Sequence, residues 1–167
     1  RSESVSGYDF LGPTDTHWHT FGYDVGMMNE FYELKPGESV RNIRMYNSES
    51  VVLSDIGKRR NYAEGDTLNC NIMMSYYGGR TLRGARLTVR LFIGEDVHIC
   101  KAFDVPDVEN GRVAQLAAFA ETLPYIGKAA EMRLYASVET DGFFAENEWE
   151  LYLFPKTEPN DYDGITV

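Results

Sequence analysis

The stretch Glu146-Asn147-Glu148-Trp149-Glu150-Leu151-Tyr152-Leu153-Phe154-Pro155 decides the fold of this chain. Successive side chains of a β-strand point to opposite faces, so one face of the stretch carries Trp149, Leu151 and Leu153. The opposite face carries a row of carboxylates, followed by two aromatic residues: Glu146, Glu148, Glu150, Tyr152 and Phe154. This alternation predicts a strand in a sheet that buries one face and leaves the carboxylates of the other solvated. Pro155 cannot donate to a sheet ladder and should end the strand.

The same alternation recurs upstream and predicts the partners of this strand. The β-rich segments are residues 50–54, 68–74, 87–93, 97–103 and 132–138. Residues 113–119 fit either a helix or a strand, and the flanking Gly111 and Pro124 favour the strand. About seven strands with turn signals between them, and no helix long enough for a crossover, predict an all-β, immunoglobulin-like β-sandwich.

The two ends of the chain differ in composition from this β-rich part. Residues 1–23 are rich in glycine, aromatic residues and histidine without any period, which is typical of an irregular arm. Asp24 precedes apolar residues at helical spacing and Lys35-Pro36-Gly37 supplies a stop, so we expect one short helix over residues 24–34. The predicted division is an arm with a short helix at 1–37, the sandwich at 38–155 and a polar linker at 156–167.

Charge and hydropathy argue against two classes of partner. The chain has 167 residues and a formal charge of -10. Binding to phosphates needs a basic stripe, so we expect neither nucleic acid nor an anionic membrane as a partner. The apolar runs are no longer than a strand, so no segment should span a bilayer. The chain opens on Arg1 without a signal-like segment, and we expect a piece of a longer protein whose export signal lies elsewhere.

Cys70 and Cys100 are the two cysteines of the chain. They are too few for a disulfide scaffold and too far apart in sequence for a metal or redox motif of the CxxC type. Cys70 alternates in step with Leu68 and Ile72, so it should be a small buried side chain. We expect both thiols to be free and buried, with a disulfide between them as the alternative.

Three stretches share a further pattern in their order and spacing. The first is Phe10-Leu11-Gly12-Pro13-Thr14-Asp15-Thr16-His17-Trp18-His19 with Gly26-Met27-Met28-Asn29-Glu30-Phe31-Tyr32-Glu33-Leu34-Lys35. The second is Tyr46-Asn47-Ser48-Glu49-Ser50-Val51-Val52-Leu53, and the third is the strand quoted above, with its Asn-x-Trp-x-Leu-x-x-x-Pro ending. Together they resemble the region after the catalytic barrel in glycoside hydrolase family 2, the β-galactosidase and β-glucuronidase type. The resemblance covers nearly the whole chain.

The resemblance implies a retaining glycoside hydrolase as the parent protein, of which this part alone catalyses nothing. The family hydrolyses the sugar linkage with two carboxylates at barrel-strand ends, and both would lie upstream of the matched stretches. The carboxylate row of the last strand cannot replace them, because nothing desolvates one member and raises its pKa. We therefore expect no catalytic residue and no cofactor. The expected role is an accessory domain that packs against the barrel and neighbouring domains of the same polypeptide, in the periplasm or outside the cell.

His17, Trp18 and His19 are the candidate substrate-binding residues of the intact enzyme. By the resemblance they would lie near the top of the last barrel strand, where side chains face the substrate. An indole can stack on a sugar ring, and imidazoles can hydrogen-bond to its hydroxyls. The alternative is that they are loop residues on the rim of the barrel. His17 and His19 could also bind a metal with Asp15, but the sequence lacks the further ligands that zinc needs, so no metal is expected.

A carbohydrate-binding module is the alternative function, since such modules stack sugars on exposed aromatic rings. The aromatic residues of interest are Tyr76, Tyr77, Phe92, Tyr135, Tyr152 and Phe154. Exposed apolar surface more often marks an interface with another domain. The interface is favoured because these rings are spread over several strands, and because Arg86 and Arg90 share a face with Phe92.

Overall fold

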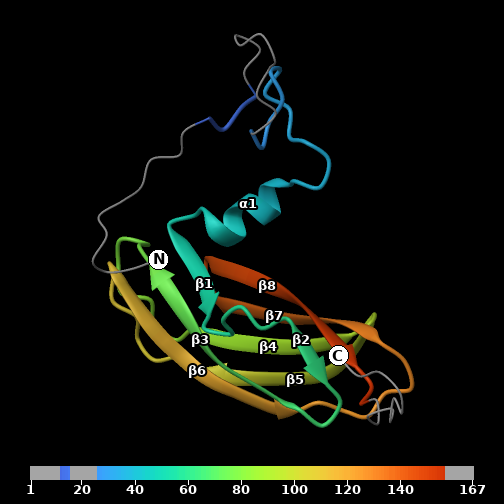
Figure 1. Ribbon diagram of the computed structural model, residues 1–167. Coiled ribbons are helices and arrows are strands. Elements are labelled where there is room, and N and C mark those ends of the chain that lie inside the picture. Colours follow the sequence, from blue (N-terminus) through green and yellow to red (C-terminus); the bar gives the residue numbers. More distant parts are fainter. Residues whose placement is uncertain (1–11, 16–25, 157–167) are drawn as a thin grey trace, which may run out of the picture.

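The computed structural model describes residues 12–15 and 26–156, and within them the chain forms eight strands and one helix. The elements in chain order are α1 (Val40–Tyr46), β1 (Ser50–Ser54), β2 (Asn61–Ala63), β3 (Thr67–Tyr76), β4 (Arg86–Ile93), β5 (Asp96–Asp104), β6 (Arg112–Thr122), β7 (Ala130–Thr140) and β8 (Phe143–Phe154). The strands form two layers, with α1 lying next to β1 and β8 (Figure 1).

The two sheets have the strand order of an immunoglobulin-like sandwich. One sheet is ordered β1-β3-β6 and the other β2-β8-β7-β4-β5. Strands β1-β3-β6 match A-B-E, and β8-β7-β4 match G-F-C. The second sheet has one further strand at each edge: β5, in the place of a C′ strand, and the short β2. Between β1 and β2 the chain changes sheets: β1 pairs antiparallel with β3, whereas β2 pairs parallel with the end of β8. The predicted all-β, immunoglobulin-like sandwich is confirmed, with eight strands in place of about seven, because the three-residue β2 is too short to show a period.

The core lies between the sheets and is built from the alternating apolar residues. Its fully buried side chains include Leu68, Ile72, Met74, Leu87, Val89, Leu91, Leu134, Val138, Leu151 and Leu153. Each such side chain contributes about 1.5–3 kcal/mol when it leaves water. On β8, Leu151 and Leu153 are buried as predicted, and Trp149 is half-buried against the same core. Burial of these side chains fixes the register, because a slip of one residue would turn all of them outward.

The ambiguous segment 113–119 is a strand, as its flanking residues indicate. It lies within β6, which pairs with β3 from Thr67↔Thr122 to Tyr76↔Arg112. The register passes from Ile72↔Ala117 to Met73↔Gln115, so Leu116 is the extra residue of a β-bulge. The bulge gives inward-facing residues a local spacing of three, and this explains why the sequence of β6 resembles that of a helix.

The predicted helix over residues 24–34 is wrong in its described part, since residues 26–34 form bends, turns and isolated bridges. The Asn29 side chain accepts hydrogen bonds from the backbone N–H groups of Phe31 (2.9 Å) and Glu33 (3.0 Å). Such side-chain bonds compete with helix formation, and Tyr32 at φ 63 completes a tight turn. The helix begins instead after Ser39, whose Oγ accepts a hydrogen bond from the Asn42 N–H at 3.0 Å.

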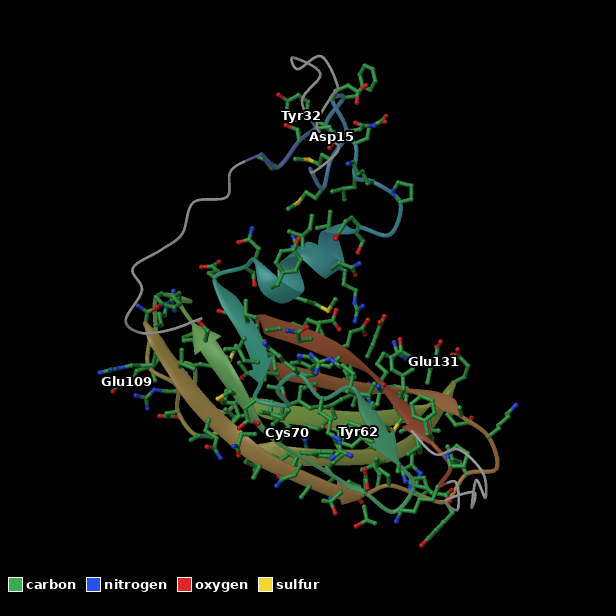
Figure 2. The ribbon with its side chains drawn as sticks, viewed as in Figure 1. Asp15, Tyr32, Tyr62, Cys70, Glu109 and Glu131 are labelled. Carbon is green, nitrogen blue, oxygen red and sulfur yellow. The ribbon has the colours of Figure 1, made fainter. Side chains whose placement is uncertain are left out.

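The two thiols differ in environment. Cys70 lies inside the sandwich (Figure 2) and is 4% exposed, as predicted, and its burial raises the pKa of its thiol. Cys100 is exposed, so the prediction that it is buried is wrong. It lies on β5, an edge strand, opposite Arg90, and its side chain therefore belongs to the outer face. Both thiols are free.

Candidate functional site

Helix α1 is attached to β8 by charged groups. Arg41 donates from Nε to Glu146 Oε1 at 2.6 Å and from Nη2 to Glu148 Oε2 at 3.2 Å. No residue of α1 is buried, so burial of apolar surface contributes little to its position. One guanidinium that bridges two carboxylates at alternate strand positions fixes both the distance and the direction of the helix.

The sequence predicted that the carboxylates of β8 are solvated, but two of the three have protein partners. Glu148 Oε2 also accepts a hydrogen bond from Arg133 Nη1 at 3.4 Å, and the Tyr135 hydroxyl donates to Glu146 Oε2 at 2.7 Å. Glu150 alone of the three is exposed. The prediction failed for Glu146 and Glu148 because their partner Arg41 lies more than 100 residues away in the sequence.

The pKa of Glu146 argues against a role for this residue as a catalytic acid. The hydrogen bond from Arg41 lowers the pKa of Glu146; partial burial opposes this effect, and the bond from Tyr135 adds to it. Partial burial raises the pKa of Tyr135, and its hydrogen bond to the Glu146 carboxylate raises it further. A general acid needs a carboxyl group with a raised pKa, which is the opposite of what Glu146 shows. The network is suited to holding α1 in place.

Asn147 makes a second attachment at the same point. Its Nδ2 group donates to the backbone carbonyl of Met45 at 3.0 Å and to that of Val52 at 2.8 Å. One amide therefore joins the last turn of α1, the edge strand β1 and the strand β8. Asn147 belongs to the Asn-x-Trp-x-Leu-x-x-x-Pro ending of the last strand, and this contact gives that position a structural role.

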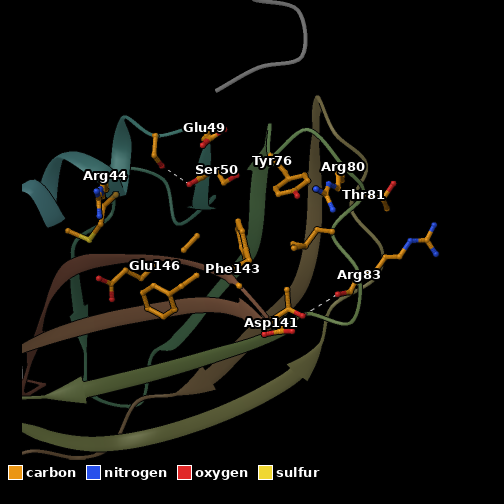
Figure 3. Close-up of a pocket in the computed structure, with 18 of the residues that line it drawn as sticks. Arg44, Glu49, Ser50, Tyr76, Arg80, Thr81, Arg83, Asp141, Phe143 and Glu146 are labelled. Atoms are coloured by element: carbon orange, nitrogen blue, oxygen red, sulfur yellow. Dashed lines mark hydrogen bonds between the residues drawn. The ribbon is translucent and has the colours of Figure 1, made fainter.

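An open hollow of about 1100 Å³ lies beside this attachment. Its walls come from α1, the start of β1, the connection between β3 and β4, and the turn between β7 and β8 (Figure 3). Tyr76 and Phe143 lie at its base and meet edge to face, with ring centroids 5.7 Å apart. Gly78 is required there, since a Cβ atom would lie 2.5 Å from the Tyr76 hydroxyl oxygen.

Four arginines line the hollow, and two of them have carboxylate partners. Arg41 is held by β8, and Arg83 contacts Asp107 at 3.3 Å. Arg44 and Arg80 form no salt bridge with any residue in the described ranges 12–15 and 26–156. The sequence patterns singled out neither residue, although Arg41 and Arg44 are three residues apart, a spacing that would place them on one face of a helix.

The predicted substrate-binding residues His17, Trp18 and His19 lie outside the described residues. Asp15, considered with them as a metal ligand, is described: its Oδ1 accepts from Lys35 Nζ at 2.8 Å and from the Gly26 N–H at 2.9 Å. The Lys35 hydrogen bond is the main cause of the lowered pKa of Asp15. Within residues 12–15 and 26–156, no three side chains of the metal-binding types come together.

The exposed aromatic residues do not form one platform. Tyr76 is buried at the base of the hollow. The Arg133 guanidinium lies 4.5 Å from the centroid of the Phe92 ring, and that of Arg90 lies 5.7 Å from the centroid of the Tyr135 ring. These two rings are therefore covered by cations on the outer face of the sheet. Tyr152 and Phe154, at alternate positions of β8, remain exposed.

Comparisons with known proteins extend the description of the fold. The profile of the family described as Domain of unknown function (DUF8488) matches residues 66–155. No curated protein sequence matches the chain. No helix among the described residues has the length and apolar content needed to cross a membrane.

Several solved structures are similar at low identity. A CARDB domain from Pyrococcus furiosus is 14% identical over 64% of this chain and 94% of its own length, with a TM-score of 0.44. A β-glucuronidase from Parabacteroides merdae is 13% identical over 63% of this chain, with a TM-score of 0.40. A family 123 glycoside hydrolase from Clostridium perfringens is 13% identical over 66% of this chain, with a TM-score of 0.43. The chain spans 14% of the length of the glucuronidase and 28% of that of the family 123 enzyme. At these values the likenesses assign neither an activity nor a ligand.

Proposed function

The chain belongs to the family described as Domain of unknown function (DUF8488), and we propose that it is a non-catalytic accessory β-sandwich of a family 2 glycoside hydrolase. In this proposal it packs against the catalytic barrel of the same polypeptide and takes part in carbohydrate degradation outside the cytoplasm. The support is the resemblance of its three stretches to the region after the barrel, in the same order. The sandwich architecture agrees with that role.

The observation that carries the proposal is the fixed attachment of α1 to the sandwich. A helix without a buried residue is held by Arg41 and by Asn147 at the point where β1 and β8 meet. Such an attachment orients whatever is joined to the N-terminal side of α1 relative to the two sheets. A domain that serves as a rigid support needs this property, because relative motion is the default between linked domains.

The proposal includes a division of the chain and a role for its first part. Residues 1–37 would complete the barrel, residues 38–155 would form the sandwich, and residues 156–167 would lead to a following domain. His17, Trp18 and His19 would contact the sugar in the intact enzyme. Hydrolysis would use two carboxylates of the barrel, so the chain alone would have no catalytic residue.

The coding sequence before Arg1 tests this proposal. We expect a barrel of roughly 300 residues with two carboxylates at strand ends. The chain alone should not hydrolyse p-nitrophenyl β-galactoside or β-glucuronide, and Trp18→Ala in the full-length enzyme should slow hydrolysis. A coding sequence without a barrel, or hydrolysis by the chain alone, would refute the proposal. Unchanged kinetics of Trp18→Ala would remove only the role of Trp18.

A carbohydrate-binding module is the second candidate, and the exposed Tyr152 and Phe154 favour it. They project from one face of β8 at alternate positions, which would suit two neighbouring sugar rings. Affinity electrophoresis of the chain in gels that contain soluble polysaccharides would detect such binding. Saturable retardation that Tyr152→Ala and Phe154→Ala remove would support the module.

A further inference from the structure

Two charged side chains, Lys101 and Glu121, occupy inward-facing positions on the edge strands β5 and β6. We infer that Lys101, held by Glu121, prevents β5 from pairing with the β5 strand of a second copy of the chain. The pair thereby keeps two copies from joining edge to edge at the open side of the sandwich. This role is independent of the proposed function, because it concerns contacts between copies and not between domains.

β5 has an unpaired edge. It ends the five-stranded sheet, as β6 ends the three-stranded sheet. Within residues 12–15 and 26–156, β4 is the strand that pairs with β5, so the backbone groups on the other side of β5 have no strand partner. Figure 1 shows β5 and β6 next to each other along this open side of the sandwich. An unpaired edge of nine residues is a template for a strand from another copy.

The sequence of β5 favours such pairing except at one position. Residues 97–103 read Val-His-Ile-Cys-Lys-Ala-Phe, without proline or glycine, and Val97 is 52% exposed. With the histidine neutral, Lys101 has the single formal charge of this segment. Short segments of high β-propensity and low charge associate readily when their edge is free. Lys101 is therefore the residue that separates β5 from an association-prone strand.

Lys101 faces the interior of the sandwich. It lies opposite Val89 of β4, whose side chain is fully buried, so both belong to the inner face of the sheet. Its neighbours on that face, Ile99 and Phe103, are partly buried against the core. An apolar side chain at this position would continue their row, and lysine gives up that contact.

Glu121 holds the lysine at the boundary with water. Lys101 Nζ donates to Glu121 Oε2 at 2.6 Å and to the Ala120 carbonyl at 3.4 Å, and it lies 5.4 Å from the centroid of the Phe119 ring. Glu121 lies opposite Leu68 and so occupies an inward position of β6. The two charged side chains are 41% and 21% exposed. A strand added to β5 would take both from water, and covering an ion pair is costly.

A link that merely stabilises the two sheets is the alternative role for this pair. Partly exposed ion pairs contribute little to stability, and an apolar side chain of similar length would keep the contacts of the lysine stem. Removing the charge should therefore leave the urea midpoint nearly unchanged and increase association between copies. A stabilising link would give the reverse, with a lower midpoint and no association.

Lys101→Met tests the inference, because methionine resembles the lysine stem in length but has no charge. Sedimentation velocity should show an association constant at least roughly tenfold above that of the unaltered chain. The matched control Lys128→Met, in the exposed connection between β6 and β7, should sediment as the unaltered chain does. Lys101→Glu combined with Glu121→Lys keeps a charge at both positions and should not associate. Urea denaturation is measured at concentrations too low for association, since association itself stabilises the fold.

A spin label on Cys100 shows where the copies meet. Cys100 is exposed and Cys70 is buried, so the label should react at Cys100. Cys100 is the middle residue of β5, and antiparallel pairing of two β5 strands about their centres would bring the labelled residues to about 5 Å from each other at the backbone. The electron paramagnetic resonance spectrum of labelled Lys101→Met should therefore broaden as the copies associate.

Several results would overturn the inference. They are a monomeric Lys101→Met, equal association of Lys128→Met, and association without broadening of the spectrum. Association of the unaltered chain through β5 would overturn it as well. A lower urea midpoint or loss of the fold in Lys101→Met, without association, would make the pair a link between the sheets only.

Discussion

The inner face of the five-stranded sheet and the contact between α1 and β8 hold the molecule together in different ways. Between the sheets, side chains such as Leu91 and Leu134 are completely buried, and they carry no polar group that would need a hydrogen-bond partner. At α1 no side chain is buried, and the helix is held by the Arg41 guanidinium and the Asn147 amide. The stability of the core therefore depends on the apolar area that it buries and on how well its side chains pack. The position of α1 depends instead on charge and on single hydrogen bonds.

This difference means that the two regions should respond to different changes. Apolar burial depends little on pH or salt, but salt bridges between partly exposed groups are screened by salt and lost when a partner is neutralised. The sandwich should thus remain folded under conditions that release α1.

The largest effect is expected from Leu134→Ala, which acts only on the core. Leu134 is fully buried, opposite Leu91 on β4 and Trp149 on β8. Removing its side chain should lower the free energy of unfolding by about 2–5 kcal/mol, measured by urea denaturation. The control Val97→Ala, at an exposed position of the edge strand β5, should change it by about 0.5 kcal/mol or less. Similar losses for the two variants would show that the buried face does not dominate stability.

Asn147→Ala should have an intermediate effect, because it acts where the two regions meet. The carbonyls of Met45 and Val52 lose their side-chain donor, and the loss of these two partly buried hydrogen bonds should cost about 1–3 kcal/mol in total. Urea denaturation should show this loss, and amide exchange in α1 should accelerate. The matched control is Asn69→Ala on the exposed side of β3. If Asn147→Ala destabilises no more than Asn69→Ala, the amide does not join helix and sheets.

The smallest effect on global stability is expected from Arg41→Ala. It should lower the free energy of unfolding by about 1 kcal/mol or less, because the ion pair between Arg41 and Glu146 is partly exposed. Its effect on α1 should be larger, with faster amide exchange in residues 40–46. The folded pKa of Glu146 is lowered, so the Arg41–Glu146 contribution is complete above the ordinary glutamate pKa of about 4.3 and is lost as pH falls through the lower folded value.

Titration of the Glu146 carboxyl, followed by NMR, would measure its pKa in the folded protein. Arg41→Ala should raise its pKa toward the ordinary value, and in the unaltered protein α1 should loosen only below about pH 4.3. In contrast, Arg86→Ala, on the same outer face, should leave the pKa of Glu146 unchanged. An unaltered pKa in Arg41→Ala would show that the helix is held by something other than this pair.

The sequence predicted the strands correctly where apolar and polar residues alternate regularly. Its predictions were ambiguous or wrong where that alternation is interrupted. Leu68, Ile72 and Met74 on β3 are buried as their period requires. The bulge at Leu116 disturbs the same period on β6, and only the pairing with β3 resolves it. The helix was predicted over residues 24–34 and is found at Val40–Tyr46, because the spacing of apolar residues does not reveal that the Asn29 side chain closes a tight turn. The signal for the true helix was present in Ser39 followed by Val40 and Ile43.

The sequence by itself indicated a two-layered β fold, because strands that alternate apolar and polar residues over residues 50–154 must cover their apolar faces with a second layer. Only the tertiary structure decided where the charged groups meet. Arg41 and Glu146 are 105 positions apart, and Arg44 and Arg80 share a hollow because α1 crosses the end of the sandwich. Periodicity is a local property of the chain, whereas an ion pair or a hollow depends on distances that exist only after the chain has folded.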